Sequence, residues 1–564
     1  MRSKEEITNE YKRWKAVIAD ETSIDSDVLQ ELECMDSEAV EDAFYRDLVF
    51  GTGGLRGVIG AGTNRMNVYT VAKASQGLAD YVLRNYPEKP SIAIAYDSRI
   101  KSDLFSQVAA SVFAANGIKA FIYSELMPTP CLSYAVRVLG CSAGIVITAS
   151  HNPSHYNGYK VYGSDGCQIT TRAATEIQNE INKLDIFNDV RKKTFDEACE
   201  SGLVEVINES VFTDFIEEVK NQSVLYGDEI NRDVAIVYSP LNGTGLKPVT
   251  RVLSESGFTN ITIVKEQEMP DGNFPTCPYP NPEIREAMEL GLQYCEKTGA
   301  DLMLATDPDA DRCGIAVKTV DGYQLITGNE VGILLLDYIC SQRTKHEKMP
   351  EHPVFIKTIV TMDLAEKIAV HYGVDTINVL TGFKFIGEAI GVLEQEGRET
   401  DYICGFEESY GYLTGSYVRD KDAVNAAYMI CEMFAYYKTR DISLLDKLQE
   451  LYQTYGYCLN TLHSYTFDGP TGMTRMQKIM ECFHSGLHEI ADQKVLRTED
   501  YSKGLNGLPA SEVLKYYING GSVVVRPSGT EPKLKVYISI TAKDKENTRF
   551  IEESIVNDLR NYIQ

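Results

Sequence analysis

Three times along this sequence a short apolar strand runs directly into a polar loop of unusual composition. The predicted strands are 143–148, 302–305 and 402–405, and the loops that follow them begin at Ala149, Asp307 and Phe406. Open α/β sheets bind their ligands beyond the carboxyl ends of their strands. The repetition therefore predicts three related α/β units whose loops face one shared site.

The surrounding pattern supports this interpretation and adds a fourth unit. Each of the first three segments also holds a strand, a helix and a second strand, predicted at 91–96, 104–115 and 120–123, at 234–238, 249–254 and 261–264, and at 354–357, 362–371 and 376–380. The remainder predicts a helix at 474–484, strands at 521–525 and 534–540, and a closing helix at 545–562. The expected fold class is α/β, with three related mixed-sheet domains (1–208, 209–325 and 326–450) and a C-terminal α+β domain (451–564).

Charge and composition exclude several classes of function. The 564 residues carry 55 Lys and Arg against 81 Asp and Glu, a net charge of −26, which disfavours nucleic acid and anionic membranes as partners. The amino terminus has no apolar segment of a signal peptide, and the longest apolar run, 331–336, is too short to span a bilayer. We expect a cytoplasmic protein. The absence of C-x-x-C and H-E-x-x-H spacings argues against zinc chemistry.

Three aspartates alternate in the loop that begins at Asp307. Asp307, Asp309 and Asp311 can reach one hard divalent cation, and carboxylates this close need a metal or basic groups to neutralise them. Counting from Asp307 places Arg312 at position six and Lys318 at position twelve, so the loop is not an EF-hand. An aspartyl-phosphate phosphatase, with a nucleophilic carboxylate in this loop, stays open as an alternative.

Ser150 ends the first of the three strands, where its hydroxyl is expected at the sheet edge. Pro153 stiffens the chain behind it, and no G-x-S-x-G surrounds it, which disfavours an α/β-hydrolase. Lys160 follows ten positions later, close enough to meet the serine. Upstream, Arg56 lies in a Gly-rich loop that allows close approach to a phosphate.

Further loops supply groups that bind a phosphorylated sugar. The turn 526–530 offers a guanidinium, two hydroxyls and an accessible backbone N–H, which favours phosphate binding. Glu407 and Ser409 offer a carboxylate and a hydroxyl, the groups that hold sugar hydroxyls. The additional cations are Lys384, Arg419 and Lys421. This set indicates phosphoryl transfer on a sugar phosphate.

Four motifs together resemble the α-D-phosphohexomutase family. They are T-A-S-H-N-P at 148–153, D-P-D-A-D-R at 307–312, G-F-E-E-S-Y-G at 405–411 and R-P-S-G-T at 526–530, and their order and spacing match over nearly the whole chain. The resemblance implies a four-domain enzyme with one site in a central cleft. The two Glu before Ser409, with the T-G-F-K and R-D-K-D segments, are most similar to the phosphoglucomutase branch and its longer subgroup.

That branch implies interconversion of glucose 1-phosphate and glucose 6-phosphate, through a phosphoserine and with glucose 1,6-bisphosphate as intermediate and activator. Alternatives are phosphopentomutase or phosphomannomutase activity, a glucose 1,6-bisphosphate synthase, and a catalytically silent sugar-phosphate sensor. Tyr410 and Gly53 depart from the commonest residues at their positions, Phe and Ser, and leave the sugar preference open. A monomer or weak homo-oligomer is expected.

The resemblance also assigns roles to individual residues. Ser150 carries the phosphoryl group and, with the three aspartates, would bind Mg²⁺ through a phosphoserine oxygen. Lys160 and Lys384 are candidates for proton transfer, and Arg56 and Lys160 would stabilise charge on the phosphoryl group. The substrate would be bound by His151, Arg312, Glu407, Ser409, Arg419, Lys421, Arg526, Ser528, Gly529 and Thr530.

Overall fold

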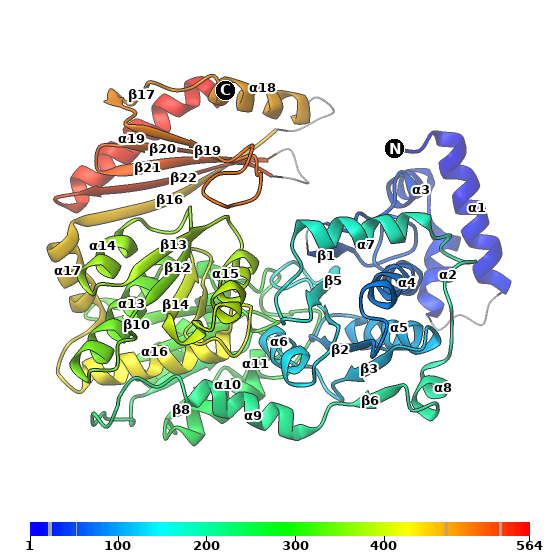
Figure 1. Cartoon of the computed structure of the whole chain (residues 1–564), viewed down its shortest axis with the longest axis horizontal. Coiled ribbons are helices and arrows are strands. Elements are labelled where there is room, and N and C mark those ends of the chain that lie inside the picture. The colour runs from blue at the N-terminus through cyan, green and yellow to red at the C-terminus, as the bar shows by residue number, and fades with distance from the viewer. Residues whose placement is uncertain (21–24, 52, 468–471, 529–532, 564) are drawn as a thin grey trace.

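The computed structural model describes residues 1–20, 25–51, 53–467, 472–528 and 533–563 (Figure 1). Four sheets of four to six strands follow one another along the described chain. Figure 1 shows the first unit on the right, the third on the left and the C-terminal unit above the third. The predicted fold class, three mixed-sheet α/β units followed by an α+β unit, is confirmed.

The first unit is a six-stranded sheet in the order β1-β5-β4-β2-β3-β6. Its strands are β1 Gly54–Val58, β2 Ser91–Tyr96, β3 Lys119–Ile122, β4 Ala143–Ile147, β5 Tyr156–Gly163 and β6 Val204–Val206. Its helices are α1 Lys4–Asp20, α2 Ser26–Cys34, α3 Ser37–Phe44, α4 Val68–Asn85, α5 Ser102–Ala115, α6 Thr129–Val138, α7 Thr171–Lys183 and α8 Phe195–Glu200. Strand β4 is buried along its whole length, as its apolar sequence predicts.

The second unit is a five-stranded sheet in the order β11-β10-β9-β7-β8. Its strands are β7 Ile236–Ser239, β8 Ile261–Ile263, β9 Leu302–Thr306, β10 Cys313–Thr319 and β11 Gly322–Ile326. Its helices are α9 Glu209–Lys220, α10 Leu246–Glu255, α11 Lys265–Glu268 and α12 Arg285–Thr298. Strand β9, like β4, is completely buried, and the aspartate loop follows its last residue.

The third unit is a four-stranded sheet in the order β13-β12-β14-β15. Its strands are β12 Val354–Thr358, β13 Asp375–Val379, β14 Tyr402–Glu407 and β15 Gly411–Leu413. Its helices are α13 Gly328–Lys345, α14 Leu364–His371, α15 Phe383–Gln395, the 3₁₀ turn Glu399–Asp401, α16 Ala423–Lys438 and α17 Leu444–Tyr455. A capping box between Thr327 and Glu330 begins α13, and the Asp422 side chain caps α16.

The C-terminal unit is an antiparallel sheet in the order β16-β22-β21-β20-β19, covered by helices. Its strands are β16 Tyr457–Thr466, β17 Glu489–Ile490, β18 Gln493–Lys494, β19 Arg497–Asp500, β20 Leu514–Ile518, β21 Gly521–Pro527 and β22 Lys533–Ala542. Its helices are α18 Gly472–His484 and α19 Lys545–Ile563. Ten residue pairs join β16 to β22, which ties the segment that enters the unit to its centre.

The first three motif loops are connections between antiparallel neighbours. In each of these units a central parallel strand runs into the loop and the chain returns beside it, from β4 to β5, from β9 to β10 and from β14 to β15. In the C-terminal unit the described part of the fourth motif begins at the end of β21, which pairs with β22 in antiparallel fashion. Equivalent places in three sheets therefore supply the first three motifs.

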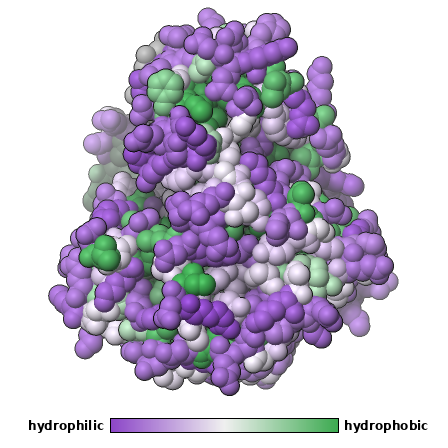
Figure 2. Space-filling view, turned by 90° about the vertical axis from the view of Figure 1, so that its left-hand side faces the viewer, coloured by the Kyte–Doolittle hydropathy of each residue, from purple (hydrophilic) through white to green (hydrophobic). Residues whose placement is uncertain are grey.

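The hydrophobic cores explain how the units are held together. One continuous cluster of buried residues runs from the α6 side of the first sheet through the second and third units. The C-terminal unit has its own core, and a smaller cluster that includes Ile359, Leu380, Val524 and Tyr537 joins it to the third unit. Figure 2 shows one face of the molecule, mostly hydrophilic with scattered apolar residues. Among the described residues, no helix is both long and apolar enough to cross a lipid bilayer.

Candidate active site

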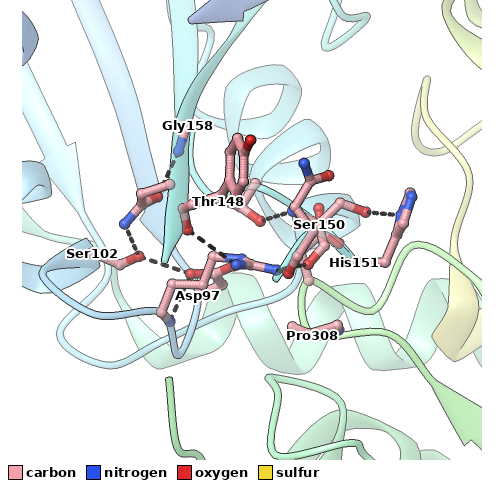
Figure 3. Close-up of polar contacts among 12 residues, drawn as sticks. Asp97, Ser102, Thr148, Ser150, His151, Gly158 and Pro308 are labelled. Carbon is pink, nitrogen blue, oxygen red and sulfur yellow. Dashed lines mark hydrogen bonds and ion pairs between the residues drawn. The ribbon is translucent and has the colours of Figure 1, made fainter. Parts of the chain in front are cut away.

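Ser150 lies directly after β4 and beside the aspartate loop of the second unit. Its side chain is 4% exposed, and its Oγ donates a hydrogen bond to Asp307 Oδ2 at 2.8 Å. The Ser150 N–H donates to Thr148 Oγ1 at 2.8 Å, and His151 Nδ1 lies 3.2 Å from Ser150 Oγ (Figure 3). Residues from two units, 157 positions apart, therefore meet at one hydroxyl.

Asp307, Asp309 and Asp311 form one buried cluster. Each is at most 1% exposed, and one carboxylate oxygen of each lies within 4.8 Å of the others. Burial, together with the charges of Asp311 and Asp309, raises the pKa of Asp307 well above its usual range. The second carboxylate oxygens, Asp309 Oδ1 and Asp311 Oδ1, accept no hydrogen bond from the described chain. Crowded, buried and unpartnered oxygens are a donor set that fits a hard divalent cation.

Two lysines partly neutralise this cluster. Lys160 Nζ lies 2.7 Å from Asp309 Oδ2 and 3.2 Å from Asp311 Oδ2, and Lys421 Nζ lies 2.9 Å from Asp311 Oδ2. Burial alone would lower the pKa of each lysine, but the neighbouring carboxylates raise both. Lys160 stands on β5, where it pairs with Val146 of β4. The strand pairing therefore places Lys160 beside the strand that leads into the serine loop.

Neighbouring units fix the aspartate loop in place. Thr129, at the start of α6 in the first unit, donates from its N–H to Asp309 O at 2.9 Å and from its hydroxyl to Asp309 Oδ2 at 3.0 Å. From the third unit, the Ala423 N–H donates to Ala310 O at 3.1 Å. The loop is thus held from both sides.

The G-F-E-E-S-Y-G motif at 405–411 lies at the end of β14. Glu407 is 5% exposed, and burial raises its pKa although Lys421 and Arg312 oppose the shift. Burial, with the charge of Glu407 beside it, raises the pKa of Glu408 to about 7. The Arg312 guanidinium contacts Glu283 of the second unit. Ser409 lies beside them at the wall of the cavity.

A cavity of about 580 Å³ joins these loops. Of the predicted residues, its lining includes His151, Arg312, Lys384, Glu407, Ser409, Lys421 and Arg526. All four units thus contribute to one cleft, which the repeated plan predicts for the first three units and the family resemblance implies for all four. A volume in this range suits a small-molecule ligand. Burial lowers the pKa of Lys384, at the start of α15.

Some predicted residues are not brought into this cleft. Arg419 is fully buried and turns away, with Nη2 2.8 Å from Glu394 Oε2 on α15 and Nη1 donating to Val418 O at 3.1 Å. Arg56, on β1, does not line this cavity, but it donates to Asn152 Oδ1 at 3.1 Å and interacts electrostatically with Asp309, Asp311 and Arg312. Ser528 lines an adjoining cavity behind Arg526. Gly529 and Thr530 lie outside the described residues.

The sequence interpretation did not select Glu283 or Lys535, and it noted Glu408 within the 405–411 motif without giving it a role; all three line the cleft. Lys535 had a detectable signal, since it lies two residues beyond Lys533 on a strand and residues at that spacing share a face. It stands opposite Arg526 in the β21–β22 pairing. No motif or periodic pattern in the sequence analysis points to Glu283.

The fold and the cleft together define a class: a four-unit protein of α/β and α+β domains with one charged cleft shared by all four units. The chain matches the models of phosphoglucomutase/phosphomannomutase α/β/α domain I at 47–186, domain II at 213–322 and domain III at 327–455, and of the C-terminal domain at 488–555.

Curated relatives agree with these matches. The phosphoglucomutase of Staphylococcus saprophyticus is 36% identical over 541 residues, which cover 93% of this chain and 97% of the relative. The Staphylococcus aureus (strain MSSA476) phosphoglucomutase is 36% identical over 89% of this chain and 91% of its own length. The chain belongs to the phosphoglucomutase/phosphomannomutase family and is an enzyme of the phosphohexomutase type.

Solved structures share the fold. A putative phosphomannomutase from Thermus thermophilus superimposes with a TM-score of 0.68 at 19% identity, over 92% of this chain and 99% of that one. Parafusin, a phosphoglucomutase from Paramecium in its open form, gives a TM-score of 0.68 at 17% identity, over 92% and 94% of the two chains. At this level of identity the similarity shows a shared fold and nothing more.

Proposed function

We propose that this enzyme interconverts glucose 1-phosphate and glucose 6-phosphate through a phosphorylated Ser150. The observation that carries the proposal is the 2.8 Å contact of Ser150 Oγ with Asp307 in a three-carboxylate cluster beside the cleft. The relatives named phosphoglucomutase, at 36% identity over most of the chain, favour glucose phosphates as substrates.

The proposed reaction has two phosphoryl transfers. First the bond between phosphorus and Ser150 Oγ breaks, a bond forms to the 6-hydroxyl oxygen of glucose 1-phosphate, and that hydroxyl loses its proton. The resulting glucose 1,6-bisphosphate turns end for end in the cleft. The bond between phosphorus and the 1-oxygen of the sugar then breaks as a bond to Ser150 Oγ forms, the proton of the Ser150 hydroxyl passes to the 1-oxygen, and glucose 6-phosphate leaves. Each half reaction uses the same serine.

Asp307, Asp309 and Asp311 would hold Mg²⁺, which when bound would polarise the oxygens of the transferring phosphoryl group. Magnesium is favoured because every donor is a hard carboxylate oxygen. Lys160 and Lys421, already paired with these carboxylates, hold the cluster together and place positive charge beside Ser150. Arg56, close to the loop at Asn152, would stabilise the same developing charge.

For proton transfer from the sugar hydroxyl, we favour Lys384 over Lys160. Burial lowers the pKa of Lys384, whereas the Asp309 and Asp311 carboxylates raise that of Lys160. A general base works best when its pKa lies near the working pH. Lys160 is then assigned to charge stabilisation alone.

The far end of the substrate is assigned to the walls opposite Ser150. Glu407 and Ser409 would hold sugar hydroxyls in either orientation, and Arg526 and Ser528, with Gly529 and Thr530 next in the sequence, would bind the phosphate that is not transferred. Lys535, opposite Arg526 in the strand pairing, strengthens this cationic wall. His151, Arg312 and Lys421 would contact the phosphoryl group nearer Ser150.

A coupled assay for glucose 6-phosphate tests the proposal, with Mg²⁺ and a trace of glucose 1,6-bisphosphate. We expect fast turnover of glucose 1-phosphate and background rates for Ser150→Ala. Mannose 1-phosphate and deoxyribose 1-phosphate run in parallel separate the phosphomannomutase and phosphopentomutase alternatives. Wild-type turnover by Ser150→Ala would contradict the mechanism. A cytoplasmic location and a monomeric or weakly associated state stay predictions.

A further inference from the structure

Arg99 is a buried arginine next to the serine loop that the sequence interpretation did not select. It follows β2 in the first unit and is 3% exposed. Its Nη2 donates to the carbonyl oxygens of Ser150, at 2.5 Å, and Asn152. Its Nη1 donates to those of Pro153, at 2.9 Å, and Tyr156, at 3.0 Å. One guanidinium therefore binds four backbone carbonyls of the loop between β4 and β5.

The guanidinium is itself fixed from two sides. Asp97 Oδ2 lies 3.4 Å from Arg99 Nε, and Asp97 Oδ1 accepts from the Arg99 N–H at 2.9 Å and from Ser102 Oγ at 2.8 Å. Figure 3 shows Asp97 and Ser102 to the left of Ser150, on the side opposite His151. From the second unit, the Phe274 ring lies 5.0 Å from the guanidinium carbon. Arg99 thus connects the serine loop to the unit that carries the aspartates.

This arrangement matters because Ser150 has a left-handed backbone, with φ of 52°. That conformation aims Oγ at Asp307, and the carbonyl bound by Arg99 Nη2 belongs to the same residue. A planar guanidinium can donate to four acceptors in a fixed fork, whereas a lysine ammonium has three donors and no fixed plane. Charge alone therefore cannot replace Arg99.

We propose that Arg99 is a positioning residue for the phosphoryl-carrying serine, an inference that rests on the proposed function. It contacts no residue that lines the sugar side of the cleft among those described, and it acts through the loop by keeping Ser150 Oγ directed at the aspartate cluster in both half reactions. Its loss is expected to slow phosphoryl transfer while leaving substrate binding unchanged.

The test is Arg99→Lys, which keeps the positive charge and removes the fork. We expect kcat to fall about 10- to 100-fold, because small misplacement of reacting groups costs this much, with KM within about twofold. Hydrogen exchange at the amides of 150–156 is expected to accelerate, while exchange in β4 is unchanged. The matched control is Arg2→Lys, since Arg2 also donates to a backbone carbonyl of the first unit, Phe44 O at 3.0 Å, far from Ser150.

A folded Arg99→Lys enzyme with wild-type kcat, or with reduced kcat and unchanged exchange at 150–156, would overturn the inference. If Arg99→Lys does not fold, Asp97→Asn replaces it, because it keeps the acceptor for Ser102 and removes the charge beside Arg99 Nε. For Asp97→Asn we expect a smaller fall in kcat and a smaller acceleration of exchange at 150–156. Wild-type kcat and exchange would overturn the inference. Turnover by Ser150→Ala would contradict the proposed function instead. Failure of the Arg99 inference and failure of the proposed function are therefore distinguishable.

Discussion

Three residues in equivalent loops share an uncommon backbone: Ser150, Ala310 and Tyr410 have φ of 52°, 47° and 64°. None is glycine, and each such residue costs about 1–3 kcal/mol, which persists only where the surroundings enforce it. Here Arg99 and Thr148 hold Ser150, and the Ala423 N–H holds Ala310. Strain of this kind sets the direction of the neighbouring side chains.

At the same scale, Asp309→Asn tests the metal assignment. It keeps the size of the side chain and removes one negative charge from the cluster that contacts Lys160. Since ligand charge tunes affinity, we expect Mg²⁺ binding, measured by calorimetry without substrate, to weaken at least tenfold. Asp321→Asn, in the exposed turn between β10 and β11, is the control. Equal Mg²⁺ affinity for both variants would refute the assignment.

Glu408 gives the chain a pH-dependent stability. Its folded pKa, about 7, lies above its usual 4.5, so its contribution to stability is fully present below pH 4.5 and is lost as the pH rises through 7. Glu408→Gln is therefore expected to be more stable than wild type by about 1–3 kcal/mol at pH 8, with the difference vanishing near pH 4.5.

Calorimetric melting at both pH values checks this expectation for Glu408. The control is Glu289→Gln, which makes the same substitution at an exposed position on α12. If Glu408→Gln and wild type melt at the same temperature at pH 8, then water in the cleft solvates the Glu408 carboxylate.

At the scale of elements, the turn between β7 and α10 supports the aspartate loop. A Cβ added at Gly243 would lie 2.3 Å from Pro308 Cα and 2.5 Å from Pro308 O. Gly243→Ala must therefore push the loop that carries Asp307 and Asp309, at a cost of about 1–3 kcal/mol. We expect weaker Mg²⁺ binding and a lower melting temperature.

The matched control for Gly243→Ala is Gly391→Ala in α15. There the added Cβ would meet only Asp165 Oδ2, at 3.9 Å, and alanine favours the helix. Unchanged Mg²⁺ affinity in Gly243→Ala would mean that the turn adapts without moving the aspartates.

Apolar strands followed by polar loops were predictable from sequence with small errors. Strand 143–148 is observed as Ala143–Ile147 and strand 402–405 as Tyr402–Glu407, because continuous burial leaves a clear apolar run. The antiparallel return strand β5 was not predicted. Its sequence mixes Asn157, Gly158 and Lys160 with tyrosines, and only the completed sheet shows that both of its faces are covered.

The site was partly predictable for a similar reason. A motif identifies residues whose type is unusual for a turn, such as Ser150 and the three aspartates. It does not give the direction of a side chain: Arg419 and Lys421 lie two residues apart, yet one turns to Glu394 and the other to Asp311. The charge partners decide that choice: Glu394 lies in the same third unit, and Asp311 lies in the second. The domain boundaries 208/209, 325/326 and 450/451 stay a prediction.

At the scale of the whole molecule, Asp363 joins the C-terminal unit to the third unit. Asp363 Oδ1 accepts from Lys515 Nζ at 3.0 Å and Oδ2 from Ser522 Oγ at 2.6 Å, and both partners stand in the C-terminal sheet. The fully buried Lys357 Nζ lies 3.7 Å from the same carboxylate. A charge cluster and the small apolar cluster around Tyr537 therefore fix the angle of one cleft wall.

Asp363→Asn would leave two buried lysines without this carboxylate, a change that costs about 3–5 kcal/mol. We expect the C-terminal unit to melt in a separate calorimetric transition below that of the remaining chain. Asp375→Asn, exposed on β13, is the control. A single transition at the wild-type temperature would show that the apolar cluster alone holds the unit.

The cavity takes its walls from residues between His151 and Ser539. During synthesis on a ribosome, at roughly 5–20 residues per second, the serine loop therefore emerges well before its opposite wall exists. A nascent chain that ends after the third sheet has the serine and aspartate loops but lacks the cleft wall that the C-terminal unit supplies. If the proposed function holds, catalytic activity is therefore expected only after the last strands are synthesised, and a chain stalled earlier is expected to be inactive.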